Sequence, residues 1–307
     1  MGFTPETLPD LGGRVYLVTG GNTGMSEEKG KAAMKEINGL LPNAELHLLK
    51  MDMTNLQSVV SAAKEFCRRE KYLHGLVNNA GIMATPFAKT VDGYESQFQT
   101  NYLSHWLLTY CLLPTMVETA NNSVRGIVRI VNVTSNAHEN VPECGIDLQD
   151  IDQASGGPIS RYGSSKLASI LHTKELARRF SMPETRAAYW GVRYEDNTGG
   201  EIWVSSVHPG MVKTNLLSQA NGSMAVIIMG KILSGVSKTG LIGLTPETGA
   251  FTQLFAVASE DFTREMNGSY LIPIAKVGKP SKKAEDKQMA TDLWDWTEKE
   301  MKAKELI

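Results

Sequence analysis

Val18-Thr19-Gly20-Gly21-Asn22-Thr23-Gly24-Met25 is the stretch that decides the fold. It follows the run Arg14-Val15-Tyr16-Leu17-Val18, whose β-branched and apolar side chains are typical of a buried parallel strand. Glycines at the end of such a strand permit a tight turn and let the backbone approach a pyrophosphate closely. The charge of a pyrophosphate also suits the N-terminus of a following helix. The stretch therefore predicts the start of a nucleotide-binding fold.

Strands and helices alternate along the rest of the chain, which predicts a doubly wound, Rossmann-like parallel sheet in a single α/β domain. The expected strands span 14–19, 45–51, 75–78, 126–133, 202–208 and 269–274. The expected helices span 27–41, 56–71, 92–102 running on into 104–120, 162–180, 245–258 and 285–304. Thr54 and Gln57 have the spacing of a capping box ahead of the second helix.

The single domain, 1–307, is expected to have three parts. Residues 11–275 form the core, and residues 276–307 form a charged tail that ends in a helix. Residues 216–244 are apolar, interrupted by Gly and Ser, and follow a Pro-Gly turn at the carboxyl end of a strand, where ligands bind in open α/β sheets. We interpret them as a substrate-covering lid; the alternative is an ordinary pair of packing helices.

Composition limits the partners and the compartment. The 307 residues are 42% hydrophobic and 21% charged, with a net charge of −2, which gives no electrostatic case for nucleic acid or for an anionic membrane. The apolar run over 224–229 is too short to span a bilayer. Three widely spaced cysteines fit neither a disulfide framework nor a zinc site, so no metal is expected. These features and the lack of a signal-like N-terminus predict a cytoplasmic protein.

Tyr162 and Lys166 are the first candidates for chemistry. At a spacing of four they share one face of a helix, and a nearby cation favours the phenolate, so the tyrosine pKa is expected to fall. This pair is common by chance and gains weight from Ser135, which ends the apolar strand Val131-Asn132-Val133-Thr134-Ser135. A hydroxyl there can stabilise charge on a substrate oxygen; the alternative is a serine that begins a turn.

Other polar groups are predicted near the same edge of the sheet. Asn78-Asn79-Ala80-Gly81 follows a strand, where amides can tie adjacent strand ends together. Asn101 interrupts an apolar helix, so it either kinks the helix and binds water near the site or faces solvent. The turn over 207–214 ends another strand and presents backbone groups that can hold a carboxamide and phosphates, unless it is only a turn.

Together these segments resemble the classical short-chain dehydrogenase/reductase family, in the family's order and over nearly the whole chain. The ending Lys279-Pro280-Ser281 before a Trp-bearing helix is similar to the branch of retinol-dehydrogenase-like and fungal reductases. The resemblance implies an oxidoreductase that interconverts an alcohol and a carbonyl on a small, fairly apolar molecule. It implies NADP, or else NAD, as cofactor, and a homodimer formed through the helices that bear Asn101 and Tyr162.

The resemblance also implies residue roles. Tyr162 is the general acid/base, Lys166 binds the nicotinamide ribose, Ser135 polarises the substrate oxygen and Asn101 supports a proton-relay water. Asp52 meets the adenine, and Asn79 lies beside the adenosine ribose. The full cofactor-binding set is Gly20, Asn22, Gly24, Asp52, Asn79, Tyr162, Lys166, Val212 and Thr214.

The chain departs from the family at Ser26, where a third glycine is usual. The first helix, the second strand and the charged residue that chooses NAD or NADP are not found, and a block of about 25–30 residues is missing. The missing block is explained by a gene-model or splicing artefact, by a natural variant whose remaining helix fills the space, or by a shifted alignment. A rebuilt crossover would place the 45–51 strand beside the first strand or leave a gap in the sheet.

The sequence allows one other function and argues against another. A reductase-like protein without activity follows if the lost segment prevents cofactor binding. Hydrolysis by a Ser–His pair is not supported, because no Gly-x-Ser-x-Gly elbow surrounds Ser135 and His138 reads as a loop residue.

Overall fold

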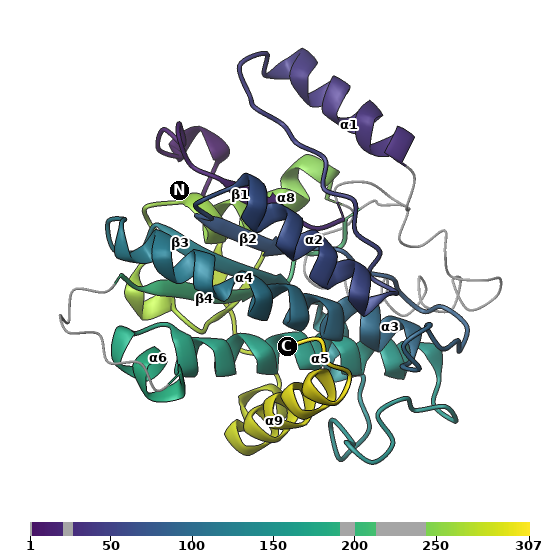
Figure 1. Cartoon of the computed structure of the whole chain (residues 1–307). Coiled ribbons are helices and arrows are strands. Elements are labelled where there is room, and N and C mark those ends of the chain that lie inside the picture. The colour runs from purple at the N-terminus through teal and green to yellow at the C-terminus, as the bar shows by residue number, and fades with distance from the viewer. Residues whose placement is uncertain (1, 21–26, 191–199, 213–243) are drawn as a thin grey trace.

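A mainly parallel sheet forms the centre of the molecule (Figure 1). The computed structural model describes residues 2–20, 27–190, 200–212 and 244–307. Within them the strand order is β1-β2-β3-β4-β5-β6. Strands β1 to β5 are parallel, and β6 pairs antiparallel with β5. The strands are β1 (Tyr16–Val18), β2 (Gly75–Asn78), β3 (Val128–Val133), β4 (Ile202–Val207), β5 (Tyr270–Ile272) and β6 (Lys276–Val277).

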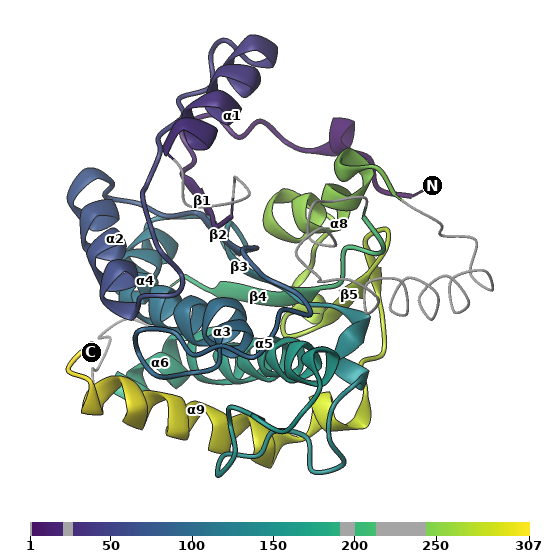
Figure 2. The same ribbon diagram turned by 90° about the vertical axis from the view of Figure 1, so that its right-hand side faces the viewer.

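Helices cover both faces of the sheet (Figure 2). The α-helices are α1 (Glu27–Leu40), α2 (Leu56–Arg69), α3 (Ser96–Phe98), α4 (Ser104–Asn121), α5 (Pro158–Phe180), α6 (Pro183–Trp190), α8 (Pro246–Ala258) and α9 (Lys287–Ala303). Between α3 and α4 lies the π-helical turn η2 (Gln99–Leu103). The 3-10 turns are η1 (Pro5–Thr7), η3 (Asn136–Glu139), η5 (Arg264–Met266) and η6 (Lys282–Glu285). The α/β prediction is therefore confirmed.

Alternation along the strands builds the two cores. Leu76, Ile130 and Val204 belong to the larger core, together with apolar residues of α2, α4 and α5. Their neighbours Val77, Val131 and Trp203 belong to the smaller core, together with α8. Successive side chains of a strand point to opposite faces, so strands that are apolar at every position become buried on both sides.

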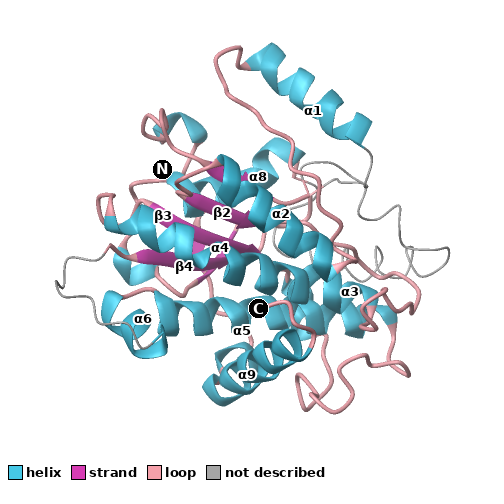
Figure 3. Cartoon of the chain, viewed as in Figure 1, coloured by secondary structure: helices cyan, strands magenta, loops and turns pink. Residues whose placement is uncertain are grey.

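The predicted strand over 45–51 is wrong. These residues form a loop between α1 and α2 (Figure 3). Leu49 and Met51 pack against the larger core, and the segment lines a groove along α2. Its apolar side chains are thus partly buried without its backbone pairing with β1. Among the described residues β1 pairs only with β2 and forms an edge strand, and Val18 is 52% exposed. Neither expected placement of a 45–51 strand is therefore seen, and the outer edge of β1 has no partner strand among the described residues.

Helix α1 projects from the body in two perpendicular views (Figures 1 and 2). Its last turn and the next residue expose Ile37, Leu40 and Leu41. The predicted capping box also differs from the structure: Asn55 caps α2 by accepting a hydrogen bond from the Ser58 backbone N–H, while Thr54 bonds to Asp52.

Helix α9 packs along α5 (Figure 2) and reaches α4 through Trp294. Trp294 of α9 is buried, with its ring 5.0 Å from that of Trp106 and 5.5 Å from that of Phe180, centroid to centroid. The Tyr102 hydroxyl also hydrogen-bonds the Thr297 hydroxyl at 2.8 Å. Helix α9 thus contacts the helices that bear Asn101 and Tyr162 within the same chain.

Candidate functional site

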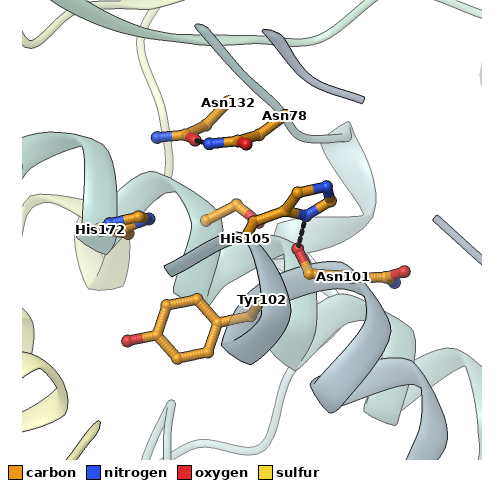
Figure 4. Close-up of a pocket in the computed structure, with 7 residues that line it drawn as sticks. Asn78, Asn101, Tyr102, His105, Asn132 and His172 are labelled. Carbon is orange, nitrogen blue, oxygen red and sulfur yellow. Dashed lines mark hydrogen bonds between the residues drawn. The ribbon is translucent and has the colours of Figure 1, made fainter. Parts of the chain in front are cut away.

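The carboxyl ends of β1, β2 and β3 meet at one edge of the sheet, as parallel strands require. Amides join them as expected: Asn78 Nδ2 donates to Asn132 Oδ1 at 2.8 Å, and Asn79 Nδ2 donates to the Thr19 carbonyl at 2.9 Å (Asn78 and Asn132 in Figure 4). Gly20 has φ +74°, and a Cβ there would lie 2.7 Å from the Ala80 Cα. Only glycine lets the two turns approach this closely.

Helix α5 supplies Tyr162 and Lys166. Pro158 starts the helix at a position where its missing N–H is harmless. The two side chains lie one turn apart and are 6% and 4% exposed. Between them, Gly163 would place a Cβ 2.3 Å from the Asn140 carbonyl oxygen, so its lack of a side chain lets α5 pack against η3. Because η3 begins at Ser135, this contact brings the serine to Tyr162.

Ser135 begins a turn, as the alternative prediction for this residue expected. It caps η3, with its Oγ accepting from the Ala137 N–H at 3.1 Å and donating to Asn136 Oδ1 at 3.2 Å. The nearby Ser135 hydroxyl also lowers the pKa of Tyr162, which opposes the effect of burial. The structure therefore brings Ser135 and Tyr162 together.

The expected fall in the Tyr162 pKa is wrong for this structure. Burial raises the pKa of Tyr162 to about 12, and burial lowers the pKa of Lys166 to about 8. The Lys166 ammonium lies 5.7 Å from the centre of the Tyr162 ring and donates to the Val133 carbonyl at 2.9 Å. Loss of solvent disfavours the charged form of both groups, and for Tyr162 this outweighs the opposing effect of the Ser135 hydroxyl.

Asn101 lies in the π-turn η2 and is buried, so it interrupts the helix and does not face solvent. Its Oδ1 accepts from the Ile82 N–H at 2.9 Å, and its Nδ2 donates to the Ile82 carbonyl and to Ser165 Oγ at 3.0 and 2.9 Å. Ser165 Oγ in turn donates to the Tyr162 carbonyl at 2.7 Å. These bonds fix Asn101 against the helix that carries Tyr162.

The remaining predicted residues are placed unevenly. The Asp52 carboxylate accepts from the Thr54 N–H and hydroxyl at 2.8 and 2.7 Å. Val212 forms an isolated bridge with Leu244 and packs close to Gly249 of α8. Three predicted residues and nearly all of the predicted lid lie outside the described residues: Asn22, Gly24, Thr214 and 216–243.

Two histidines hydrogen-bond backbone carbonyls of the site. The sequence patterns predicted neither contact. His105 Nδ1 bonds the Asn101 carbonyl at 3.0 Å (Figure 4), and its Nε2 bonds Thr19 Oγ1 at 2.8 Å. His138 Nδ1 bonds the Ser135 carbonyl at 2.7 Å, and its Nε2 accepts from the Ser281 N–H at 3.0 Å. His138 is thus buried and joins Ser135 to the tail, so its interpretation as a loop residue is wrong. His105 follows Asn101 by four residues and His138 follows Ser135 by three. This spacing is the sequence signal that could have indicated the two contacts.

Comparison with known proteins agrees with this arrangement. Residues 13–146 match the family described as short chain dehydrogenase. The chain is 42% identical to the short-chain dehydrogenase/reductase drtF of Aspergillus calidoustus, over 99% of this chain and 98% of that protein. It is 30% identical to retinol dehydrogenase 12 of Mus musculus, over 94% of this chain and 86% of that protein.

The chain belongs to the short-chain dehydrogenase/reductase family. The crystal structure of an uncharacterized protein from Mycobacterium paratuberculosis is similar, with a TM-score of 0.68, 28% identity and 98% of both chains covered. NADPH-bound carbonyl reductase from chicken fatty liver shares the fold, with a TM-score of 0.52, 18% identity and 86% and 98% of the two chains covered. This dehydrogenase/reductase chain is thus an oxidoreductase of the CH–OH class by family.

The alignment with drtF is longer than this chain. It extends over 325 positions, whereas this chain has 307 residues, so drtF holds residues without a counterpart here. Among the residues that the structure describes, this dehydrogenase/reductase has an open edge at β1.

Proposed function

We propose that this chain is an NAD(P)-dependent oxidoreductase that interconverts an alcohol and a carbonyl on a small, fairly apolar molecule. The observation that carries the proposal is the convergence of Ser135, Tyr162 and Lys166 at the carboxyl end of β3. Carbonyl reduction needs a hydroxyl, a phenol and an ammonium near the reacting oxygen. Here the Lys166 ammonium is fixed by the Val133 carbonyl, and the Ser135 hydroxyl lies near the Tyr162 phenol.

Each side chain has a defined task in the proposal. In reduction the Tyr162 phenol donates its proton to the carbonyl oxygen, and in oxidation the tyrosinate removes the hydroxyl proton. The Ser135 hydroxyl donates to the same oxygen and stabilises its developing charge. The Lys166 ammonium stabilises the tyrosinate, and Asn101 supports the water that returns protons to solvent.

The residues present fit the nicotinamide half of a dinucleotide. A Cβ on Gly81 would lie 3.2 Å from Asn101 Oδ1 and 3.6 Å from Lys166 Nζ, so glycine keeps this space open. A bound nicotinamide supplies or accepts the hydride at its C4. Lys166 would hold the ribose hydroxyls, Gly20 would admit the phosphates, and Asn79 and Asp52 would lie toward the adenosine. We favour NADP because the resemblance to related reductases favours it.

The proposal extends to the chain's organisation. Residues 11–275 form the catalytic core, 216–244 a lid over an apolar substrate and 276–307 the tail. Cys67, Cys111 and Cys144 are all free thiols, which supports the cytoplasm as the compartment. No helix among the described residues is long and apolar enough to cross a bilayer. Because α9 packs along α5 and reaches α4 through Trp294, we favour a monomer over the homodimer.

Replacement of Tyr162 tests the mechanism. Tyr162→Phe removes the proton donor and keeps the ring, so we expect kcat to fall by a factor of about 10² or more with NADPH binding unchanged. Tyr94→Phe is the matched control, because the Tyr94 hydroxyl bonds Glu300 of α9 instead of a group of the site. Unchanged turnover in an active Tyr162→Phe preparation would falsify the assignment.

The second candidate is a reductase-like protein without activity. The observation in its favour is the unpaired edge of β1 next to the predicted cofactor turn. Fluorescence titration with NADH and NADPH separates the two functions and also shows which cofactor is preferred. Binding with a Kd in the micromolar range excludes the silent protein, and no binding by a folded chain supports it.

A further inference from the structure

His105 joins two parts of the molecule that are 86 residues apart in sequence. It lies on α4 and is 3% exposed. Its Nδ1 faces the Asn101 carbonyl, and its Nε2 faces the hydroxyl of Thr19, the residue before Gly20 (Figure 4 shows the first contact). One imidazole therefore bridges the π-turn beside Tyr162 and the end of the strand that leads into the glycine turn.

The hydrogen bonds of Thr19 decide which proton His105 carries. Thr19 Oγ1 accepts from the Asn79 and Ala80 N–H groups, both at 2.9 Å, and these use its two lone pairs. Its hydroxyl proton is then free to be donated, and His105 Nε2 at 2.8 Å is a closer acceptor than the Val77 carbonyl at 3.5 Å. On the other side a carbonyl can only accept, so Nδ1 carries the ring proton. Every contact is satisfied by one neutral tautomer.

The charges around His105 favour the same state. Burial and, to a smaller extent, the Lys166 ammonium lower the pKa of His105 to about 4, against the hydrogen bond to the Asn101 carbonyl, which raises it. A proton on Nε2 would also have no acceptor, because both lone pairs of the Thr19 hydroxyl oxygen already accept from backbone N–H groups. The ring is therefore a fixed connector with a defined direction, Thr19 O–H to Nε2 and Nδ1–H to the Asn101 carbonyl.

We propose that His105 is a positioning residue of this active site, which sets the Asn101 carbonyl relative to the cofactor turn through Thr19. The proposal rests on the proposed oxidoreductase function. Asn101 is bonded through Ser165 to the Tyr162 carbonyl, so the connection runs from the turn that would receive phosphates to the residue that would transfer the proton. Displacement of the π-turn would disturb proton transfer more than it disturbs cofactor binding.

Two amide substitutions test the two hydrogen bonds of the His105 ring separately. In His105→Asn the amide nitrogen occupies the place of Nδ1 and still donates to Asn101, but it does not reach Thr19. In His105→Gln the amide occupies the place of Nε2 and accepts from Thr19, but the donor to Asn101 is lost. We expect kcat to fall at least about tenfold in His105→Gln and less than about threefold in His105→Asn, with the Kd for NADPH within about twofold of wild type in both.

His172→Gln is the matched control. His172 is a buried histidine of the same polar cluster (Figure 4), and its Nε2 has no hydrogen-bond partner among the described residues. We expect its kcat to stay within about twofold of wild type. Equal losses of kcat in His105→Asn, His105→Gln and His172→Gln, in step with their melting temperatures, would show that His105 only packs.

A measurement without catalysis keeps the proposal separate from the proposed function. Long-range ¹H–¹⁵N spectra of histidine-labelled protein without cofactor report the tautomer directly. We expect His105 to be protonated on Nδ1 alone, to stay neutral down to about pH 5, and to lose this fixed state in Thr19→Val but not in Thr19→Ser. An Nε2–H tautomer, or no response to Thr19→Val, overturns the proposal even if the chain proves inactive.

Discussion

The ammonium of Lys166 is the most costly charge to bury in the site, and its titration decides the pH dependence. Its pKa is lowered to about 8 because it has lost solvent, while the pKa of Tyr162 is raised to about 12 for the same reason. Over the neutral range Tyr162 therefore holds its proton and is ready to act as an acid. Lys166 is charged below pH 8 and neutral above it.

The pH profile of carbonyl reduction follows from these two groups. We expect kcat/KM to be constant below about pH 7 and to fall above about pH 8, because loss of the Lys166 proton leaves the developing tyrosinate without a cation. Steady-state rates between pH 5 and 10 measure this. In Lys166→Arg the guanidinium stays charged, so the fall should move to higher pH or disappear. A fall that keeps its midpoint in Lys166→Arg assigns it to another group.

At the scale of elements, two short turns next to the strand ends hold the site. The π-turn η2 places Asn101, and the 3-10 turn η3 places Ser135, each with one histidine bonded to the carbonyl of that residue. The sequence predicted the helices and strands around these turns to within a few residues. It did not predict the bonds of the histidines, because their partners Thr19 and Ser281 lie 86 and 143 residues away.

His138 links η3 to the tail, so its loss should affect both. His138→Phe keeps an aromatic ring against Tyr270, 5.3 Å away between ring centres, but removes both hydrogen bonds. We expect kcat to fall about tenfold and the amide protons of 281–285 to exchange faster, because one hydrogen bond is worth about 1 kcal/mol. Activity assays measure the change in kcat, and hydrogen-exchange mass spectrometry measures the exchange of residues 281–285.

Lys283→Met is the control for His138→Phe. Lys283 Nζ donates to the Pro142 carbonyl at 2.7 Å and so anchors the tail without contacting Ser135. This variant should speed exchange in the tail and leave kcat unchanged. If His138→Phe behaves in the same way as Lys283→Met, the histidine only fastens the tail.

At the scale of the whole molecule, α9 packs along α5 and buries Trp294. Trp294 is 2% exposed between Trp106, His172 and Phe180. We expect the protein to be monomeric by light scattering. Trp294→Ala should lower the free energy of unfolding by about 3–5 kcal/mol and promote self-association through the uncovered helices. Trp296→Ala removes a partly exposed ring of the same helix and should have a smaller effect on both. A dimeric wild type would contradict the role of α9.

The open edge of β1 predicts what restoring an α–β unit would do. Insertion after Met25 of an α–β unit of about 25–30 residues should pair this edge and cover exposed Val18. We expect a higher melting temperature, less aggregation and a Kd for NADPH at least about tenfold lower. Differential scanning fluorimetry and fluorescence titration measure these changes. If the insertion leaves both unchanged, the present chain already binds cofactor in another way.

The sequence by itself determined the family and most of the elements of this protein, and it predicted the residues proposed for the chemistry. Ser135 at the end of an apolar strand and Tyr162 four residues before Lys166 depend on local periodicity, which a strand or a helix converts directly into geometry. Only the tertiary structure decided the protonation of these groups, the role of His105 and His138, and the loop at 45–51. Burial sets the pKa values, and a strand forms only where another edge is available to pair with it. Both depend on residues far apart in the chain, so no local pattern carries them.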